Sequence, residues 1–195
     1  MSKVVSRMRV KRGGPKVEHT SKLRTYIPAG MAGPQPPLGT QLGQRHINVQ
    51  NFCSTFNEMT KNHKRGVPIP TRVEVLPDNK FHILINTPPS TFLLKQAAGI
   101  LKAKIPGESV AGKITHKHLY EIAKVKSQDY SLQLHSLQEV CELLIVTARR
   151  CGIKIVRDLH PVGYGTFLQM RQQRYDAYMA KLQEEKEAKL QRVKV

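Results

Sequence analysis

The chain has 195 residues and carries 32 Lys and Arg side chains against 14 Asp and Glu side chains, a formal net charge of +18. So large a positive excess predicts a polyanionic partner, either nucleic acid or an anionic membrane surface. No apolar run approaches the roughly 20 residues that a membrane-spanning helix needs. Aromatic residues make up 6% of the chain, so stacking on aromatic side chains is not expected to dominate binding. The three cysteines, Cys53, Cys141 and Cys151, lack a CxxC spacing and indicate buried thiols in a reducing compartment.

The N-terminal segment is basic and contains no acidic residue before position 18. One interpretation is a basic arm that lies along nucleic acid. The other is a segment that directs import into the mitochondrial matrix. One segment can do both, so we treat residues 1–18 as a basic leader with a possible targeting role.

Residues 32–44 form a stiff stretch without charge, inside a longer segment, 19–57, that has no Asp or Glu. Its prolines restrict the backbone and lack amide donors, and its glycines let another surface approach closely. Such a stretch is suited to contact a protein without binding phosphates. A rigid surface loop with no contact is the alternative. The stretch includes Pro34, Pro36, Pro37, Gly33, Gly39 and Gly43.

Residues 19–86 are predicted to form a small α+β domain, one helix on a three-stranded antiparallel sheet. Residues 21–27 are the first strand, and residues 71–86 alternate apolar and polar positions around a turn at 77–79, as a hairpin does. Between them, Asn48 is a plausible N-cap for a helix. The apolar face of that helix is Val49, Phe52, Cys53, Phe56 and Met59.

Two prolines, Pro88 and Pro89, fix their own backbone angles and predict a short, semi-rigid hinge at 87–89 between two domains. Residues 90–158 are predicted to be a compact three-helix domain with a short strand after Gly152. The expected N-caps are Ser90, Thr115 and Ser136, with Glu139 completing a capping box. The first helix is expected to bury Phe92, Leu93, Gln96, Ala97 and Ile100, and the third Val140, Cys141, Leu144, Ile145, Ala148 and Cys151.

The loop between the first two of these helices contains Gly107 to Lys113, which matches the GxxxxGK start of a P-loop. A P-loop needs Ser or Thr at the next position to bind Mg²⁺, and this chain has Ile114 there. Glycines and lysines can still bring backbone amides and positive charge to phosphates; a solvated basic loop without a partner is the alternative. The pair His116 and His118 fits a surface near RNA better than a metal site.

Several motifs resemble the ribosomal protein L-eleven family, in the family's order, over about residues 20–157. They are "IPAGMAGPQPPLGTQLGQRHINVQNFC", "GVPIP", "TPPSTFLLKQAAGI", "VAGKIT", "EIAKVK" and "TARRCGIKIV". The basic leader and the charged tail look like the animal mitochondrial version. The resemblance implies that the C-terminal domain binds large-subunit ribosomal RNA at the GTPase-associated centre, through shape, 2′-OH and phosphate contacts. The residues expected to bind RNA are Gly99, Lys102, Lys104, Gly112, Lys113, Thr115, Lys117, Thr147 and Arg150.

The same resemblance implies that the N-terminal domain swings on Pro88 and Pro89 and meets translational GTPases and acidic stalk proteins transiently. The factor-facing residues would be Pro34, Pro36, Pro37 and Gly39. Two positions depart from the family pattern. Thr40 stands where relatives often have Pro, which bears on thiopeptide sensitivity, and Val146 stands where relatives usually have a small residue close to RNA.

Residues 159–195 are expected to form a charged helical extension, exposed to solvent by default or docked on ribosomal RNA or a neighbouring protein. The sequence as a whole predicts a non-enzymatic ribosomal protein of the mitochondrial matrix, without cofactor, metal, membrane contact or small-molecule substrate. An extra-ribosomal RNA-binding regulator is the alternative from another class. A nucleotide hydrolase would rest on the incomplete P-loop alone.

Overall fold

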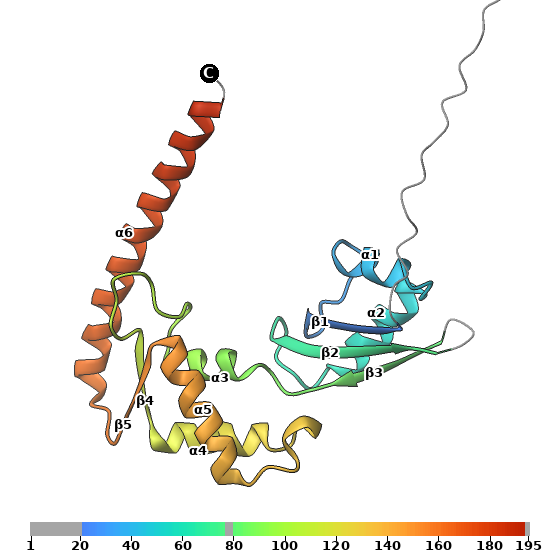
Figure 1. The fold of residues 1–195 in the computed structure, drawn as a ribbon, viewed down its shortest axis with the longest axis horizontal. Coiled ribbons are helices and arrows are strands. Elements are labelled where there is room, and N and C mark those ends of the chain that lie inside the picture. The colour runs from blue at the N-terminus through green and yellow to red at the C-terminus, as the bar shows by residue number, and fades with distance from the viewer. Residues whose placement is uncertain (1–20, 77–79, 194–195) are drawn as a thin grey trace, which may run out of the picture.

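The computed structural model describes residues 21–76 and 80–193 (Figure 1). The predicted α+β class is confirmed: a sheet and two helices precede a helical part with two short strands. The buried apolar side chains form two hydrophobic clusters that share no residue, one up to residue 85 and one from residue 93 onward. The predicted leader and the turn at 77–79 lie outside the described residues.

The N-terminal part is a three-stranded antiparallel sheet covered by two helices. Leu23 lies opposite Val73, and Val73 opposite Ile83, so the three strands present one apolar face. Phe52 and Phe56 are fully buried against this face. The elements are β1 (Lys22–Pro28), α1 (Leu38–Gly43), α2 (Val49–Met59), β2 (Pro68–Val75) and β3 (Phe81–Ile85).

The start of α2 was predicted correctly from the residues around it. The side chain of Asn48 accepts hydrogen bonds from the backbone amides of Gln50 and Asn51, which confirms the predicted N-cap. Of the expected apolar face, Met59 is 48% exposed because it ends the helix beyond the edge of the cluster. The short helix α1 was not among the predicted elements.

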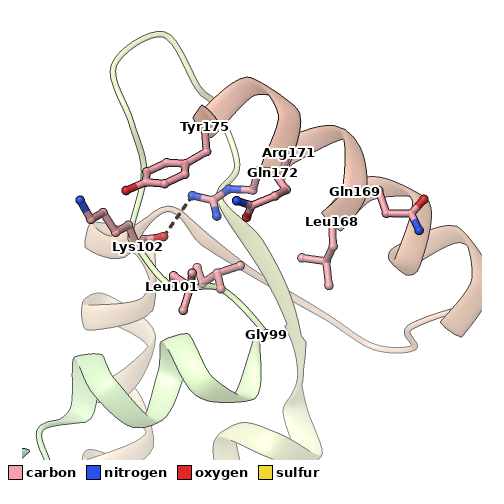
Figure 2. A pocket seen from close by; sticks show the side chains of 9 residues that line it. Gly99, Leu101, Lys102, Leu168, Gln169, Arg171, Gln172 and Tyr175 are labelled. Carbon is pink, nitrogen blue, oxygen red and sulfur yellow. Dashed lines mark hydrogen bonds between the residues drawn. The ribbon is translucent and has the colours of Figure 1, made fainter. Parts of the chain in front are cut away.

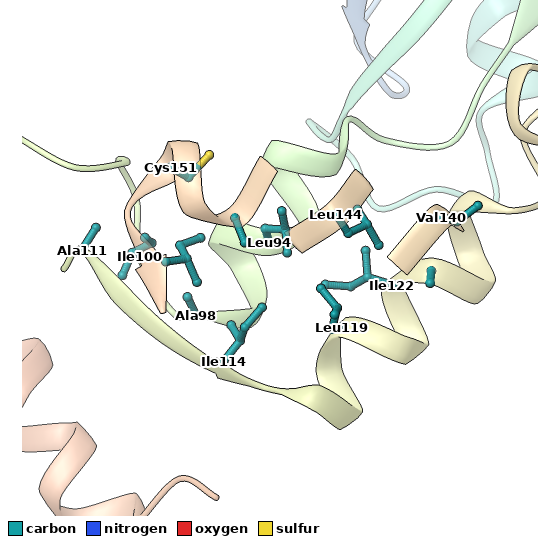
Figure 3. Packing of buried hydrophobic residues seen from close by; sticks show 13 residues of the cluster. Leu94, Ala98, Ile100, Ala111, Ile114, Leu119, Ile122, Val140, Leu144 and Cys151 are labelled. Atoms are coloured by element: carbon teal, nitrogen blue, oxygen red, sulfur yellow. The ribbon is translucent and has the colours of Figure 1, made fainter. Parts of the chain in front are cut away.

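Three helices close around the second cluster, which Figure 3 shows. Both predicted capping residues of the later helices are confirmed, Thr115 at the start of α4 and Ser136 with Glu139 at the start of α5. Gly152 ends α5 in the left-handed conformation, with φ 76°, where glycine is favoured. The elements are α3 (Ser90–Ala97), β4 (Gly112–Thr115), α4 (His116–Lys126), a 3-10 turn (Tyr130–Leu132), α5 (Leu137–Cys151) and β5 (Ile153–Val156).

The N-cap predicted for α3 is wrong, and its predicted buried face is only partly right, since Leu93 and Ala97 are half-buried against the core and Ile100 is buried. Ser90 is the first helical residue, and Pro89 precedes it without a side-chain cap. The buried side chain of the helix is Leu94, whereas Gln96 is exposed. Ile100 was counted as helical, but it follows the left-handed Gly99 (φ 63°) and reaches the core through that turn. Counting Ile100 as helical shifted the predicted buried face of α3 around the helix axis, away from Leu94.

The P-loop resemblance has no structural counterpart. A P-loop places its lysine at the start of a helix, whereas Gly112 and Lys113 lie in β4, which pairs in parallel with β5. The helix α4 begins only at His116. The strand β4 itself was missed, because its partner β5 lies far along the chain.

The C-terminal extension forms one long helix, α6 (Pro161–Val193). The expectation of a solvent-exposed helix is wrong for its first half, because Leu168 packs against the second cluster and Arg171 is only 8% exposed. The second half extends away from the rest of the chain (Figure 1). Within the described ranges, no helix has both the length and the apolar character needed to cross a bilayer.

Candidate nucleic-acid interface

The connection from α3 to β4 holds three of the predicted RNA-binding residues. We call residues 98–111 the 98–111 loop; they contain no helix or strand. Gly99 follows α3 in the left-handed conformation, and Lys102 and Lys104 are exposed. Two backbone hydrogen bonds fasten the loop to the end of α5, from the Lys104 amide to the Cys151 carbonyl (3.1 Å) and from the Ala111 amide to the Gly152 carbonyl (2.7 Å).

Gly112 was expected to let RNA approach, but it is buried. A Cβ atom at this position would lie 3.0 Å from the Cβ of Ala98 and 3.3 Å from Ile100. Close packing between β4 and the end of α3 therefore explains this glycine. Ala98, which faces this glycine, is itself fully buried.

The remaining predicted residues lie on β4, at the start of α4 and near the end of α5. Thr115 ends the strand and accepts a hydrogen bond from the His118 amide, so its hydroxyl is engaged in the capping box. Lys117 is exposed in the first turn of α4. Thr147 is half-buried and Arg150 exposed on α5, next to the loop attachment at Cys151.

The hydroxyl of Thr147 donates a hydrogen bond to the Leu143 carbonyl at 2.9 Å. Its oxygen is thus left to accept a hydrogen bond from a partner, such as an RNA 2′-OH. The neighbouring Val146, one of the two departures from the family pattern, is 46% exposed.

The docked part of α6 supplies contacts that the sequence did not predict. The Tyr164 hydroxyl donates to the Ala98 carbonyl (2.6 Å) and accepts from the Lys113 amide (3.0 Å). Burial raises the pKa of this hydroxyl, and the bond from the Lys113 amide opposes that rise. Tyr164 thereby joins the start of the 98–111 loop to the strand that follows it.

Arg171 lies between α6 and the same loop, as Figure 2 shows. Its Nε donates to a carboxylate oxygen of Glu108 at 2.8 Å, and its Nη2 donates to the carbonyls of Lys102 (3.0 Å) and Ala103 (3.2 Å). The side chains of Arg171 and Glu108 are only 9% and 7% exposed. No signal in the sequence links two charges this far apart along the chain.

Two lysines of the interface rest on aromatic rings of α6. The Nζ of Lys102 lies 5.4 Å from the Tyr175 ring centroid, and the Nζ of Lys113 lies 5.2 Å from that of Phe167. These distances fit cation–π contacts. Lys102 is exposed and Lys113 half-buried, so these rings flank two of the predicted RNA-binding lysines.

The predicted hinge is fastened on its C-terminal side. The Thr87 amide donates to Asp129 at 2.7 Å, and the Thr87 hydroxyl donates to the other oxygen of that carboxylate at 3.0 Å. Lys126 forms a buried ion pair with Asp129 and donates to the Thr87 hydroxyl (3.0 Å) and the Pro88 carbonyl (3.4 Å). One residue earlier, the Asn86 amide donates to the Pro70 carbonyl of β2 at 3.1 Å.

Of the predicted factor-facing residues, Pro34, Pro36 and Pro37 lie on the connection from β1 to α1, and Gly39 lies in the first turn of α1. Pro34, Pro36 and Pro37 are exposed. Gly39 has a structural reason, because a Cβ atom there would lie 2.0 Å from the Pro34 carbonyl oxygen. The Asn57 side chain of α2 holds this connection, accepting from the Ala32 amide (2.9 Å) and donating to the Ala32 carbonyl (3.2 Å).

Comparison with known families matches both parts of the chain. A model described as "Ribosomal protein L11, N-terminal domain" matches residues 23–81, and one described as "Ribosomal protein L11, RNA binding domain" matches residues 86–155. The chain belongs to the ribosomal protein L11 family. The 98–111 loop and α5 therefore lie within the RNA-binding domain of an L11 protein.

Individual L11 relatives support the assignment. The chain is 50% identical over 194 residues to "Large ribosomal subunit protein uL11m" of Drosophila melanogaster, covering 98% of this chain and 99% of that protein. It is 49% identical over 178 residues to the protein of the same name in Caenorhabditis elegans, covering 91% of each. A bacterial relative, "Large ribosomal subunit protein uL11" of Rhodopseudomonas palustris, is 38% identical over 137 residues, covering 70% of this chain and 95% of that protein.

The helix α6 begins after the L11 RNA-binding domain model ends at residue 155. The similarity to the Drosophila protein includes nearly the whole chain, and so nearly all of α6. Across the part of this L11 chain that the structure describes, no three His, Cys, Asp or Glu side chains gather in a metal-binding group.

Proposed function

We propose that the chain is a structural constituent of the large subunit of the mitochondrial ribosome and binds large-subunit ribosomal RNA. The match of residues 86–155 to the L11 RNA-binding domain carries this proposal. The names of the two animal relatives and the net charge of +18 support it. A strongly basic surface suits the phosphate backbone of RNA.

The proposed RNA surface consists of the 98–111 loop, the two ends of β4 and the end of α5. Its charged groups supply affinity for any RNA, whereas Gly99 and Thr147 allow a close fit to one folded segment. We propose that this segment is the GTPase-associated centre. The contact residues are Gly99, Lys102, Lys104, Lys113, Thr115, Lys117, Thr147 and Arg150, without the buried Gly112.

The N-terminal part would then move relative to the RNA-bound part and meet translational GTPases and acidic stalk proteins. The exposed prolines at 34, 36 and 37 offer such partners a surface without charge. The backbone contacts move the expected pivot away from Pro88. The Asn86 amide is bonded to β2 and the Thr87 amide to Asp129, so the torsions of Asn86 would carry the motion while Pro88 and Pro89 move with the C-terminal part.

Sedimentation of the tagged protein from lysed mitochondria tests the proposal. The protein is expected to sediment with the large ribosomal subunit and to leave it only when the subunit is dismantled. An extra-ribosomal regulator would remain near the top of the gradient, and that result would reject the proposed function.

A further inference from the structure

The 98–111 loop is irregular, yet it is held at three places by one distant element. We call residues 161–178 the docked half of α6. Its Tyr164 hydroxyl bonds to Ala98, the first residue of the loop, and to Lys113 in β4, two residues after the loop ends. Leu168 lies near Gly99: a Cβ atom built on Gly99 would be 3.5 Å from its Cδ1.

Arg171 is the third and innermost contact. A guanidinium offers several donors in a fixed plane, and here it satisfies two loop carbonyls and both oxygens of one carboxylate. The carbonyls of Lys102 and Ala103 must therefore point toward α6. The bond from the Ile105 amide to Glu108 (3.3 Å) ties the acidic partner back into the same loop.

A buried ion pair is a costly way to gain stability, because both charges lose their hydration. Its geometric demands are strict, so it favours one conformation over others that would bury the same area. The position of this pair matters, since the loop it constrains carries Lys102 and Lys104 on its exposed side. The pair therefore determines where those two positive charges stand.

We propose that the docked half of α6 holds the 98–111 loop in its RNA-binding shape before RNA is present, with Tyr164 and Arg171 as positioning residues. This inference rests on the proposed function of the same surface. A loop that is already ordered loses less conformational entropy on binding. The docked half of α6 thus raises affinity for a folded RNA without contacting it.

The first test compares Tyr164→Phe with Tyr178→Phe in the full chain. Both remove one hydroxyl from α6, but only the Tyr164 hydroxyl is hydrogen-bonded to the loop and β4, whereas no bond to the Tyr178 hydroxyl is found among the described residues. Hydrogen exchange is expected to quicken at the Lys113 amide in Tyr164→Phe alone. Binding to the folded RNA of the GTPase-associated centre is expected to weaken about tenfold, as when about a tenth of the loops are in the competent shape.

The second test compares Arg171→Met with Arg174→Met. Each loses one positive charge from α6, but Arg174 is exposed. Both should weaken binding to unstructured poly(U) equally, since they change charge equally. Only Arg171→Met should also lose a further tenfold or more for the folded RNA, with faster exchange at the amides of residues 102–108.

Two results would overturn the inference. In the first, loop exchange stays unchanged in Tyr164→Phe, which would mean that α6 does not order the loop. In the second, exchange quickens but the folded RNA binds as it does to the control variants, which would mean that loop order does not serve recognition. Tyr164→Phe keeps its ring and decides the matter if Arg171→Met fails to fold. A wild-type chain that binds folded RNA no better than poly(U) would instead reject the proposed function.

Discussion

The molecule contains two irregular segments that bear on function, and they are held in different ways. The connection through residues 29–37 contains three prolines, and its side-chain support comes from Asn57 in α2 and from Thr60, the C-cap of that helix. The 98–111 loop has a single proline, Pro106, and is held by Tyr164 and Arg171 of α6. Stiffness in the first segment is largely a local property, and order in the second is a property of the whole C-terminal part.

This difference suits the two proposed roles. A surface that meets successive protein partners needs a shape that does not depend on other contacts, and prolines supply one by restricting the unfolded and folded chain alike. A surface that binds one folded RNA needs carbonyls and lysines in defined places, which only a second element can fix. The following predictions break or sharpen that contrast, beginning with the largest effect.

Breaking the buried ion pair should harm the C-terminal part most. Arg171→Met leaves Glu108 buried without its cation, and the expected loss is about 3–5 kcal/mol of the free energy of unfolding. Urea denaturation measures it, and the exposed Arg174→Met should change stability by no more than about 0.5 kcal/mol. Equal stability of the two variants would mean that the 98–111 loop is not held as described.

The connection at 29–37 should tolerate the loss of its side-chain support better. Asn57→Ala removes both bonds to Ala32 and is expected to cost about 1–3 kcal/mol, with no change in RNA binding. Asn51→Ala, at an exposed position on the same helix, is the control. A loss as large as that of Arg171→Met would erase the contrast between the two segments.

RNA affinity should have two separable parts, one selective for the folded RNA and one that applies to any RNA. Thr147→Val removes a hydroxyl acceptor from a close-fitting face and should weaken the folded RNA about fivefold, leaving poly(U) binding unchanged. Lys117→Ala should weaken both RNAs alike and reduce the slope of log affinity against log salt by about 0.7–0.9, one phosphate contact. Filter binding over a salt series distinguishes them. A selective effect of Lys117→Ala would contradict the assignment.

Changes in the predicted hinge at 87–89 should affect RNA affinity least. Replacing both Pro88 and Pro89 with Gly removes no binding group, so affinity for the folded RNA should stay within about threefold. The glycines would add a second flexible point next to the pivot at Asn86, so factor-dependent GTP hydrolysis on ribosomes carrying the variant is the sensitive measurement and should change. A large loss of RNA affinity would place the joint inside the binding surface.

The same contrast explains what could be predicted from sequence. The caps at Asn48, Thr115 and Ser136 and the buried face of α5 were predicted correctly, since their partners lie within one or two helical turns. The site was only partly predicted. Tyr164 lies 66 residues from Ala98, and Arg171 lies 63 from Glu108, and no periodicity or spacing connects residues so far apart.

Glycines were the other weak point. From the sequence, Gly99 and Gly112 were both predicted to let RNA approach. In the structure, Gly99 has the positive φ of a turn, whereas Gly112 is buried beneath Ala98 and Ile100. A glycine needed for internal packing and a glycine that lets a partner approach cannot be told apart from a single sequence.

Amide hydrogen exchange of the full chain, with and without the folded RNA of the GTPase-associated centre, tests the central claim most directly. Because α6 already holds the 98–111 loop, we expect added protection there only from burial against the RNA, together with added protection at Lys113 and at residues 147–151, and little change at residues 29–44. Protection concentrated at residues 29–44, or spread evenly over the basic chain, would contradict the claim that the C-terminal part carries RNA recognition.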